Sequence, residues 1–385
     1  MVFLPSTIVL ASVLLAGLGS AHTHHAVGSP EYVKRANFMK TAKRSLGDCQ
    51  DQLRKRGGVY DRGRARREAL ADDIRSVRGL KRGVPYKRDL DTALATDHQS
   101  NLTGVTNNTD ASTLFSGNTS CVLAPEVTQG PYYVDGEYVR WDIREDQEGV
   151  DLYVDAQVID VNTCEPVSDV YIDFWHANAT GVYSGVVASG NGNSNDEGNL
   201  NSTFLRGIQP TDSDGVAQWL TVFPGHYTSR ATHIHLMTYT STDGNMSANG
   251  TYASETVTHV GQIFFDQDLI SEVEATSPYS INTQELTTND EDSILGEEAD
   301  DIDPFVEYVL LGDDISDGVM AWTAFGIDLT DTYSVTPAAT LTEDGGVENE
   351  NSGMGGGMGS GDGASGMPSG SGMPSGSGAM PSASA

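Results

Sequence analysis

His233 and His235, separated by one residue, are the first side chains in this sequence that could do chemistry together. In a β-strand, residues two positions apart point to the same side, so both imidazoles would leave one face of the strand. Two imidazoles on one face are suited to hold a single metal ion. A strand with a polar face is the more common reason for such a pair, so the metal hypothesis needs support from neighbouring residues.

Two tyrosines and an arginine supply that support. The stretch FPGHYTSRATHIHL (223–236) has a Pro-Gly turn followed by Tyr227 and Arg230. A turn before the strand would fold Tyr227 back toward the imidazoles. A second stretch, DFWHANATGVYSG (173–185), leads from an apolar strand through a glycine turn to Tyr183. Arg230 could form a salt bridge with one of many acids, but its closeness to the histidines favours a site that binds an anion.

The donor types indicate which metal this site would hold. A phenol has a pKa near ~10, and a strong Lewis acid is needed to keep two of them ionised at neutral pH. Zinc or copper sites favour more His, Cys or Met, and a ferrous oxygenase uses two His and one carboxylate. Two tyrosines with two histidines therefore favour one mononuclear Fe(III) ion.

Short strands separated by turn residues must position these side chains. Residues 150–161 alternate, with every second residue from Val150 to Val158 apolar. No βαβ rhythm and no nucleotide-binding glycine pattern appear. The sequence predicts an all-β fold, an antiparallel β-sandwich, with a helical basic N-terminal extension and a disordered C-terminal tail. The predicted strands are 150–161, 170–175, 216–222, 233–239, 261–265 and 319–327.

Four zones follow from composition. Residues 1–21 are predicted to be a signal peptide, because an apolar run too short to span a bilayer ends in small residues. Residues 22–100 are basic. Residues 101–335 hold the predicted sandwich. Residues 336–385 form a Gly/Ser/Met/Pro tail, which cannot bury a core.

The basic N-terminal zone has two interpretations. Residues 63–79 place Leu70, Ile74 and Val77 at helical spacing. Dibasic pairs flank this stretch, as at Lys81-Arg82, and in an exported chain they could be processing sites of a propeptide. The alternative is a basic helical extension packed against the acidic core. The sequence favours neither.

Several features predict a secreted glycoprotein. Seven Asn-x-Ser/Thr sequons follow the predicted signal peptide. Three cysteines, Cys49, Cys121 and Cys164, indicate one disulfide and one remaining thiol. Three pairings are open, and we expect Cys121–Cys164 because both cysteines lie in the β-rich zone. The sequons are at Asn101, Asn107, Asn118, Asn178, Asn201, Asn245 and Asn249.

The charge distribution excludes some partners. The formal net charge is −32, and 18 of the 22 Lys and Arg residues lie between Lys34 and Arg88. After Leu90, four arginines stand against 46 of the 54 acids, a net charge of −42. Such a surface repels nucleic acid and anionic membranes. We expect no nucleic-acid partner and no membrane anchor.

Taken together, these motifs resemble a known family. GPYY (130–133), WHANATGVYSG (175–185), PGHYTSRATHIH (224–235) and GQIFF (261–265) occur in the order seen in the intradiol ring-cleavage dioxygenases, and most resemble the secreted fungal branch, with catechol and protocatechuate dioxygenases among the relatives. FLRGIQPTDSDG (204–215) lies between them. The resemblance covers roughly residues 121–270 and implies a β-sandwich with one non-haem Fe(III).

The resemblance also implies roles for individual residues. Tyr183 and Tyr227 would be the equatorial and axial tyrosinate ligands, and Tyr227 would leave when substrate chelates. His233 and His235 would complete the ligand set. Arg230 would stabilise negative charge on the bound substrate. Gln262 would line the pocket.

The sequence thus predicts an oxidoreductase that cleaves catechol-type rings between the two hydroxylated carbons with O2, giving muconate-type diacids. The alternative is a β-sandwich module that binds a metal or a phenolic ligand without turnover. A zinc hydrolase built on His233 and His235 would need a third histidine or a carboxylate nearby. The identity of the catechol, the oligomeric state, the fate of the N-terminal zone and the role of the tail stay open.

Overall fold

The computed structural model describes residues 49, 53, 58–80, 130–188, 190–299 and 303–349. The chain divides into two compact units, Met1–Met354 and Gly355–Ala385, and every described residue lies in the first. The predicted signal peptide and the tail beyond residue 349 lie outside the described residues, as do Cys121 and the sequons at Asn101, Asn107 and Asn118.

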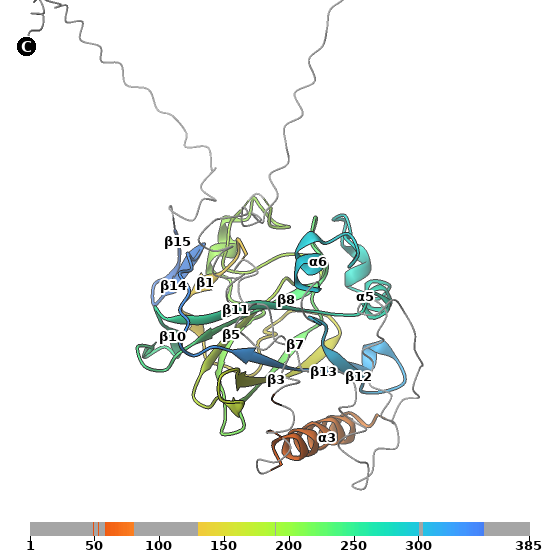
Figure 1. Cartoon of the computed structure of the whole chain (residues 1–385). Helices are drawn as coiled ribbons and strands as arrows, with labels where there is room; N and C mark the ends of the chain where they lie inside the picture. Colours follow the sequence, from red (N-terminus) through yellow and green to blue (C-terminus); the bar gives the residue numbers. More distant parts are fainter. Residues whose placement is uncertain are drawn as a thin grey trace, which may run out of the picture. The chain divides into compact units, whose positions relative to one another are not determined.

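Two sheets build the centre of the fold (Figure 1). The first has four strands in the order β11-β8-β5-β6, and all neighbours are antiparallel. The second has the order β12-β13-β3-β4, and β7 also pairs with β3. The first sheet comprises β5 (Tyr171–Trp175), β6 (Arg206–Pro210), β8 (His233–Tyr239) and β11 (Val257–Phe264). The second comprises β3 (Asp151–Asp160), β4 (Glu165–Pro166), β7 (Val216–Val222), β12 (Glu307–Leu310) and β13 (Val319–Ile327).

The main hydrophobic core lies between these two sheets. Phe174, Ile234 and Leu236 enter it from the four-stranded sheet, and Val154 and Trp219 enter it from the second sheet. The apolar residues that alternate from Val150 to Val158 all belong to this core. Burial of this apolar surface is the main force that holds the two sheets together.

The opposite face of the four-stranded sheet carries a second buried cluster, which is rich in aromatic rings. Trp175, Tyr183 and Tyr227 belong to it. Two small three-stranded sheets, β1-β14-β15 and β2-β10-β9, add to this part of the molecule. Their strands are β1 (Val134–Asp135), β2 (Glu137–Tyr138), β9 (Asn245–Met246), β10 (Thr251–Ala253), β14 (Ala339–Thr342) and β15 (Gly345–Glu348).

The predicted all-β sandwich is confirmed, with two differences. Strand β13 runs parallel to β3, so the sandwich is not purely antiparallel. A parallel pair needs a long crossover, and the whole four-stranded sheet lies between β3 and β13 in the sequence. Strands β14 and β15 lie beyond residue 335, where we expected the sandwich to end, and β14 pairs with β1.

Helix α3 (Val59–Arg78) confirms the helix expected at 63–79. Ile74 is buried and Leu70 packs against the same small cluster, whereas Val77 is 88% exposed, contrary to its expected place on the apolar face. The helix holds the second sheet through arginines: Arg66 and Arg67 both bind Asp155 of β3. Ala71 and Ile74 of the helix also pack with Tyr153, so α3 helps to bury the outer face of β3.

Two short helices, α5 (Gln267–Glu274) and α6 (Ser293–Ala299), follow β11. No helix in the described part of the chain is long and apolar enough to cross a membrane.

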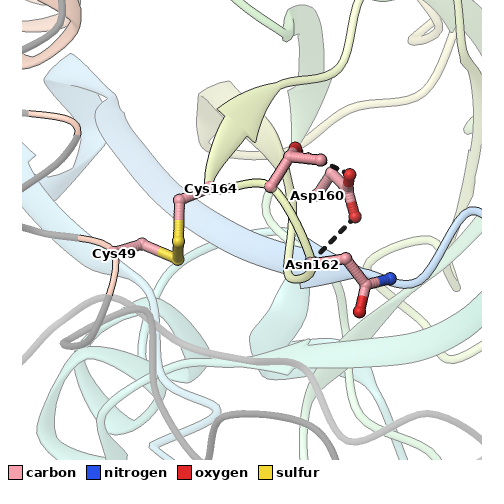
Figure 2. Close-up of a disulfide and its surroundings, with 5 residues drawn as sticks. Cys49, Asp160, Asn162 and Cys164 are labelled. Atoms are coloured by element: carbon pink, nitrogen blue, oxygen red, sulfur yellow. Dashed lines mark hydrogen bonds between the residues drawn. A yellow bond between two sulfur atoms is a disulfide. The ribbon is translucent and has the colours of Figure 1, made fainter.

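The disulfide joins Cys49 to Cys164, so the expected Cys121–Cys164 pairing is wrong (Figure 2). The position of a cysteine in the sequence did not predict its partner, because Cys49 of the N-terminal zone is buried in a cluster with Leu53, Val59 and Ile159. The turn that carries Cys164 is held by Asp160, whose carboxylate accepts hydrogen bonds from the Asn162 amide and the Thr163 hydroxyl. The bond therefore ties the basic N-terminal zone covalently to β3 and β4.

Candidate metal centre

Four donor atoms from the predicted ligands converge on the aromatic face of the four-stranded sheet. The Nε2 atom of His233 lies 3.1 Å from Nε2 of His235. The same atom lies 3.3 Å from the Tyr227 hydroxyl and 3.5 Å from the Tyr183 hydroxyl. All four side chains are at most 3% exposed. The structure brings these four predicted residues together.

These distances fit one small cation. Donors bound to a single ion at about 2.0–2.1 Å in tetrahedral geometry lie about 3.3 Å from one another. The gathered atoms are two phenol oxygens and two imidazole nitrogens, a hard donor set that suits Fe(III). The residues present therefore fit the metal that the resemblance implies.

The hydrogen bonds of His233 prepare it as a ligand. Its Nδ1 lies 2.6 Å from the carbonyl oxygen of Ala231, and a carbonyl can only accept a hydrogen bond. Nδ1 therefore carries the proton and donates it, which leaves a lone pair on Nε2. This arrangement fixes both the tautomer and the ring orientation, as in metal-binding histidines generally.

A tight turn presents Tyr183. Gly181 adopts a left-handed conformation (φ 77°), and a Cβ atom there would collide with the backbone carbonyl of His226. Asn191 then clamps the turn: its side-chain oxygen accepts from the Tyr183 amide at 2.8 Å, and its side-chain nitrogen donates to the Tyr183 carbonyl at 2.8 Å. Asn199 donates to the same carbonyl. The loop at 189–201 thus holds the backbone of a predicted ligand.

A second turn presents Tyr227. Tyr227 and Arg230 form an isolated antiparallel bridge, and Ser229 between them has φ 73°. The chain reverses there, so the Tyr227 ring returns to the histidines that start β8. The fold-back expected from the Pro-Gly turn is present.

Arg230 lies beside the donors and has carboxylate and amide partners. Its Nη1 is 3.5 Å from Nε2 of His233, and its Nη2 donates to the Gln262 side-chain oxygen at 2.5 Å. Its Nε donates to Asp292 at 2.9 Å. Gln262 pairs with His235 in the β8–β11 register. Arg230 therefore lies beside the donor atoms and also forms a salt bridge with Asp292, so both expected contacts are present.

Asp292 is the site residue that sequence reasoning missed. One of its oxygens accepts from Arg230 and from the Ala231 amide, and the other accepts from the amides of Ile294 and Leu295. It stands in the acidic stretch 287–304, where nothing local distinguishes it from the neighbouring acids. No sequence signal could have selected it without its contact to Arg230.

Aromatic rings enclose the donors. Trp175 stacks on His235 with 4.9 Å between ring centroids and 3° between planes. Tyr132 stacks on Tyr183 at 4.6 Å. Trp175 is fully buried and supports a predicted ligand. These rings exclude water and fix ring orientations.

Burial sets the ionisation of the two tyrosines. It raises the pKa of Tyr183 well above the usual range, and the neighbouring Tyr227 adds to the rise. Burial also raises the pKa of Tyr227, against the opposing influence of Arg230. Both phenols therefore keep their protons unless a strong Lewis acid displaces those protons. This again favours a highly charged metal ion at the site.

The zinc-hydrolase alternative loses support from the geometry. Across the described ranges, no three His, Cys, Asp or Glu side chains are gathered where they could hold a metal ion. The atoms closest to the histidine pair are tyrosine and arginine atoms. The two tyrosine hydroxyls beside His233 distinguish this cluster from such a site.

Comparisons with known proteins bear on most of the core. Residues 127–291 match the family model described as Dioxygenase. All six predicted site residues lie within the match, and Asp292 follows its last residue. A search of curated proteins gives no match to the chain.

Solved structures of the same kind resemble this chain. An intradiol ring-cleavage dioxygenase from Tetranychus urticae is 28% identical, with 55% of this chain and 98% of that chain covered and a TM-score of 0.45. A hydroxyquinol 1,2-dioxygenase from Pseudomonas putida DLL-E4 is 18% identical, with 54% and 66% covered and a TM-score of 0.34. A catechol 1,2-dioxygenase from Pseudomonas arvilla C-1 is 16% identical, with 77% of each chain covered and a TM-score of 0.32.

The likeness to a secreted fungal branch stays a prediction. The match over residues 127–291 confirms the resemblance that the motifs predicted, at the level of the Dioxygenase family.

Proposed function

We propose that this protein is an Fe(III)-dependent intradiol dioxygenase that cleaves catechol-type rings between the two hydroxylated carbons with O2, yielding muconate-type diacids. One observation carries the proposal: two phenol oxygens and one imidazole nitrogen lie 3.1–3.5 Å from Nε2 of His233, with a guanidinium nitrogen 3.5 Å from the same atom. A purely structural cluster has no need to gather four metal-binding atoms beside a buried cation.

The metal would be held by Tyr183, Tyr227, His233 and His235. When bound, Fe(III) supplies a Lewis acid that favours the doubly deprotonated catechol and activates the ring toward O2.

The surrounding side chains have separate tasks. The Tyr227 oxygen would take up a proton that a catechol hydroxyl releases at this site. Arg230, held by Asp292 and Gln262, would stabilise negative charge on a ring oxygen through a fixed guanidinium. Trp175 and Tyr132 keep the pocket dry, which strengthens these electrostatic interactions.

The test is an iron-loaded preparation with matched tyrosine variants. Purified protein should be red to burgundy from phenolate-to-iron charge transfer, and catechol should be consumed with one O2 per ring. Tyr227→Phe should shift or weaken the visible band and lower turnover. Tyr171→Phe, at a half-buried tyrosine outside the centre, should leave the band unchanged.

Two outcomes would contradict the proposal. Protein that stays colourless after iron loading would exclude this centre, as would a Tyr227→Phe variant with the wild-type spectrum. A catechol-induced colour shift without O2 uptake would instead favour a binding module that holds a metal or a phenolic ligand without turnover.

We also propose that the protein acts outside the cell as a glycoprotein. The predicted signal peptide and the sequons support this, and so does the Cys49–Cys164 disulfide, since such bonds persist in oxidising compartments. Asn201, Asn245 and Asn249 are exposed, whereas the Asn178 amide donates to Gln147 in a half-buried turn. Glycosidase treatment of protein from the culture medium should reduce its mass, and retention inside the cell would contradict the proposal.

A further inference from the structure

We infer that the pocket selects catechols without any further ionised group and discriminates against catechols that bear a ring carboxylate. This rests on the proposed function, because it concerns the same pocket. It goes beyond that function because it states which catechols the site binds, those without a further charged group. The basis is the pairing of every arginine of the acidic core.

Among the described residues, Arg230 is a cation in contact with a metal donor, and Asp292 already balances its charge. Nε of Arg230 lies 2.9 Å from a carboxylate oxygen of Asp292, and the two side chains are 3% and 1% exposed. Both oxygens of Asp292 accept from N–H donors, which is the pattern of an ionised carboxylate. The buried pair is therefore neutral overall.

The other two nitrogens of the Arg230 guanidinium also have neighbours within the protein. Nη2 donates to Gln262, and Nη1 lies next to Nε2 of His233. A ring oxygen bound among the metal donors would meet this edge of the guanidinium. A carboxylate elsewhere on the ring would have to find another cation.

The other three arginines after Leu90 have partners of their own. Arg140 pairs with Glu145 at 2.7 Å, and Arg144 pairs with Asp142 and Asp151 at 2.8 and 2.9 Å. No lysine occurs in this part of the sequence. Neither of these two arginines is therefore available to neutralise a bound carboxylate.

Arg206 is the buried arginine on the same sheet face, but it lies beyond Trp175. In the sheet register Arg206 pairs with Trp175, and Trp175 pairs with His235. Arg206 donates to the carbonyls of Tyr132 and Ser184, and lies 3.7 Å from Glu137. Its Nε and Nη2 are held against the protein, one strand further away than Trp175, while its buried Nη1 has no hydrogen-bond partner among the described residues.

The buried groups around Arg206 already carry more acids than cations. Asp173 is buried, and it accepts a hydrogen bond from Tyr239 at 2.9 Å. Burial, with a contribution from Glu137, raises the pKa of Asp173 well above its usual range. This side of the site does not favour another negative charge, and a buried charge without a partner is costly.

A neutral substituent meets no such penalty. Tyr132 stacks on Tyr183, and its hydroxyl makes no hydrogen bond to any described residue. The pocket wall is therefore aromatic and uncharged, which suits alkyl, hydroxyl or amide substituents.

The test compares ligands of equal shape and different charge. Iron-loaded protein is titrated without oxygen with 4-methylcatechol, 3,4-dihydroxybenzamide and 3,4-dihydroxybenzoate, and the visible charge-transfer band reports each Kd. The benzoate should bind at least about 100-fold more weakly than the benzamide, since an unpaired buried charge costs several kcal/mol. Steady-state O2 uptake should show the same order in kcat/KM.

Several results would overturn the inference. Binding of the benzoate within about threefold of the benzamide would do so, because the charge would then carry no penalty. Equal exclusion of benzamide and benzoate relative to 4-methylcatechol would show that size, not charge, makes the selection. If all three ligands fail to change the band, the proposed function fails, and this inference fails with it.

A pair of charge-matched variants locates the effect. Asp292→Asn removes the charge that balances Arg230, so the penalty on the benzoate relative to the benzamide should shrink by about tenfold or more. Glu145→Gln makes the same change of net charge at the exposed Arg140 pair, and the ratio should not change. Equal shifts in both variants would contradict the assignment to Asp292. If Asp292→Asn does not fold, the ligand series on the wild-type protein still decides.

Discussion

At the scale of single residues, Arg230 connects the chemistry of the site to the stability of the fold. It is 3% exposed and is held by Asp292 on one side and Gln262 on the other. A planar guanidinium can serve both partners and still face His233. An ammonium is a point charge and cannot reproduce that geometry.

Arg230→Lys should therefore separate metal binding from catalysis. The four donor atoms are unchanged, so the visible band of the resting iron protein should persist. Loss of one fixed donor to a developing charge costs about 10²–10³-fold in kcat in comparable sites. Absorbance and O2 uptake measure the two effects, with Arg144→Lys as a control at an arginine outside the site. Loss of the band would mean that Arg230 is needed to build the metal site itself.

At the scale of elements, two long connections between strands hold the site, one from β5 to β6 and one from β11 to β12. The loop at 189–201 supplies Asn191 and Asn199, which fix the backbone of Tyr183. The acidic segment after α5 supplies Asp292, which fixes Arg230. The strands place the histidines, and the loops place the tyrosine and the arginine, so both kinds of element are needed for one site.

Helix α3 is held to the second sheet by a buried charge. Asp155 is fully buried and accepts from Arg66 at 2.9 Å, from Arg67 at 2.9 Å and from Gln218 at 2.8 Å. The arginines lower the pKa of this carboxyl against the effect of burial, so it stays ionised. Detachment of α3 would remove both arginine partners of the Asp155 carboxylate. This loss favours a helix α3 that stays bound to the second sheet.

The double variant Arg66→Met, Arg67→Met should lower the free energy of unfolding by about 3–5 kcal/mol, because it strands a buried carboxylate. Adding Asp155→Asn should recover part of the loss, since the stranded charge is removed. Urea unfolding followed by fluorescence measures both steps. No recovery in the triple variant would show that the arginines act through packing, for example on Trp322, rather than through charge.

At the scale of the whole molecule, the sandwich keeps two histidines neutral. His176 bonds to Thr221 and to the Ala177 carbonyl, and burial lowers its pKa to about 4. His259 stacks on Phe325, and burial lowers its pKa to about 3. Both become costly when acid adds a proton.

Acid should destabilise the fold through His259. Its folded pKa of about 3 lies below the ordinary value of 6.5, so the unfolded chain binds more protons between these values. Stability from neutral His259 is complete above pH 6.5 and falls by about 1.4 kcal/mol per pH unit below it. His259→Leu removes this loss. Urea unfolding from pH 7 to pH 5 should show wild type losing stability faster than the variant by about that slope, and parallel curves would contradict it.

How much could be read from the sequence differs between strands and loops. Strands 216–222, 233–239 and 319–327 were predicted with the bounds that β7, β8 and β13 have, because their side chains pack on sheets with a two-residue period. The partner of Cys164 was predicted wrongly, and Val77 was placed on the wrong face. Both depend on how the N-terminal zone docks, which no local pattern encodes.

The sequence by itself determined which side chains could act as donors. Tyr227, His233 and His235 lie close together in the sequence, and a turn followed by a strand fixes their local geometry. The tertiary structure alone decided what surrounds them. Asp292 reaches Arg230 across 62 positions, and Trp175 reaches His235 across the β5–β8 register. Such contacts arise because burial forces charges to find partners wherever the fold brings them, and sequence distance does not limit that choice.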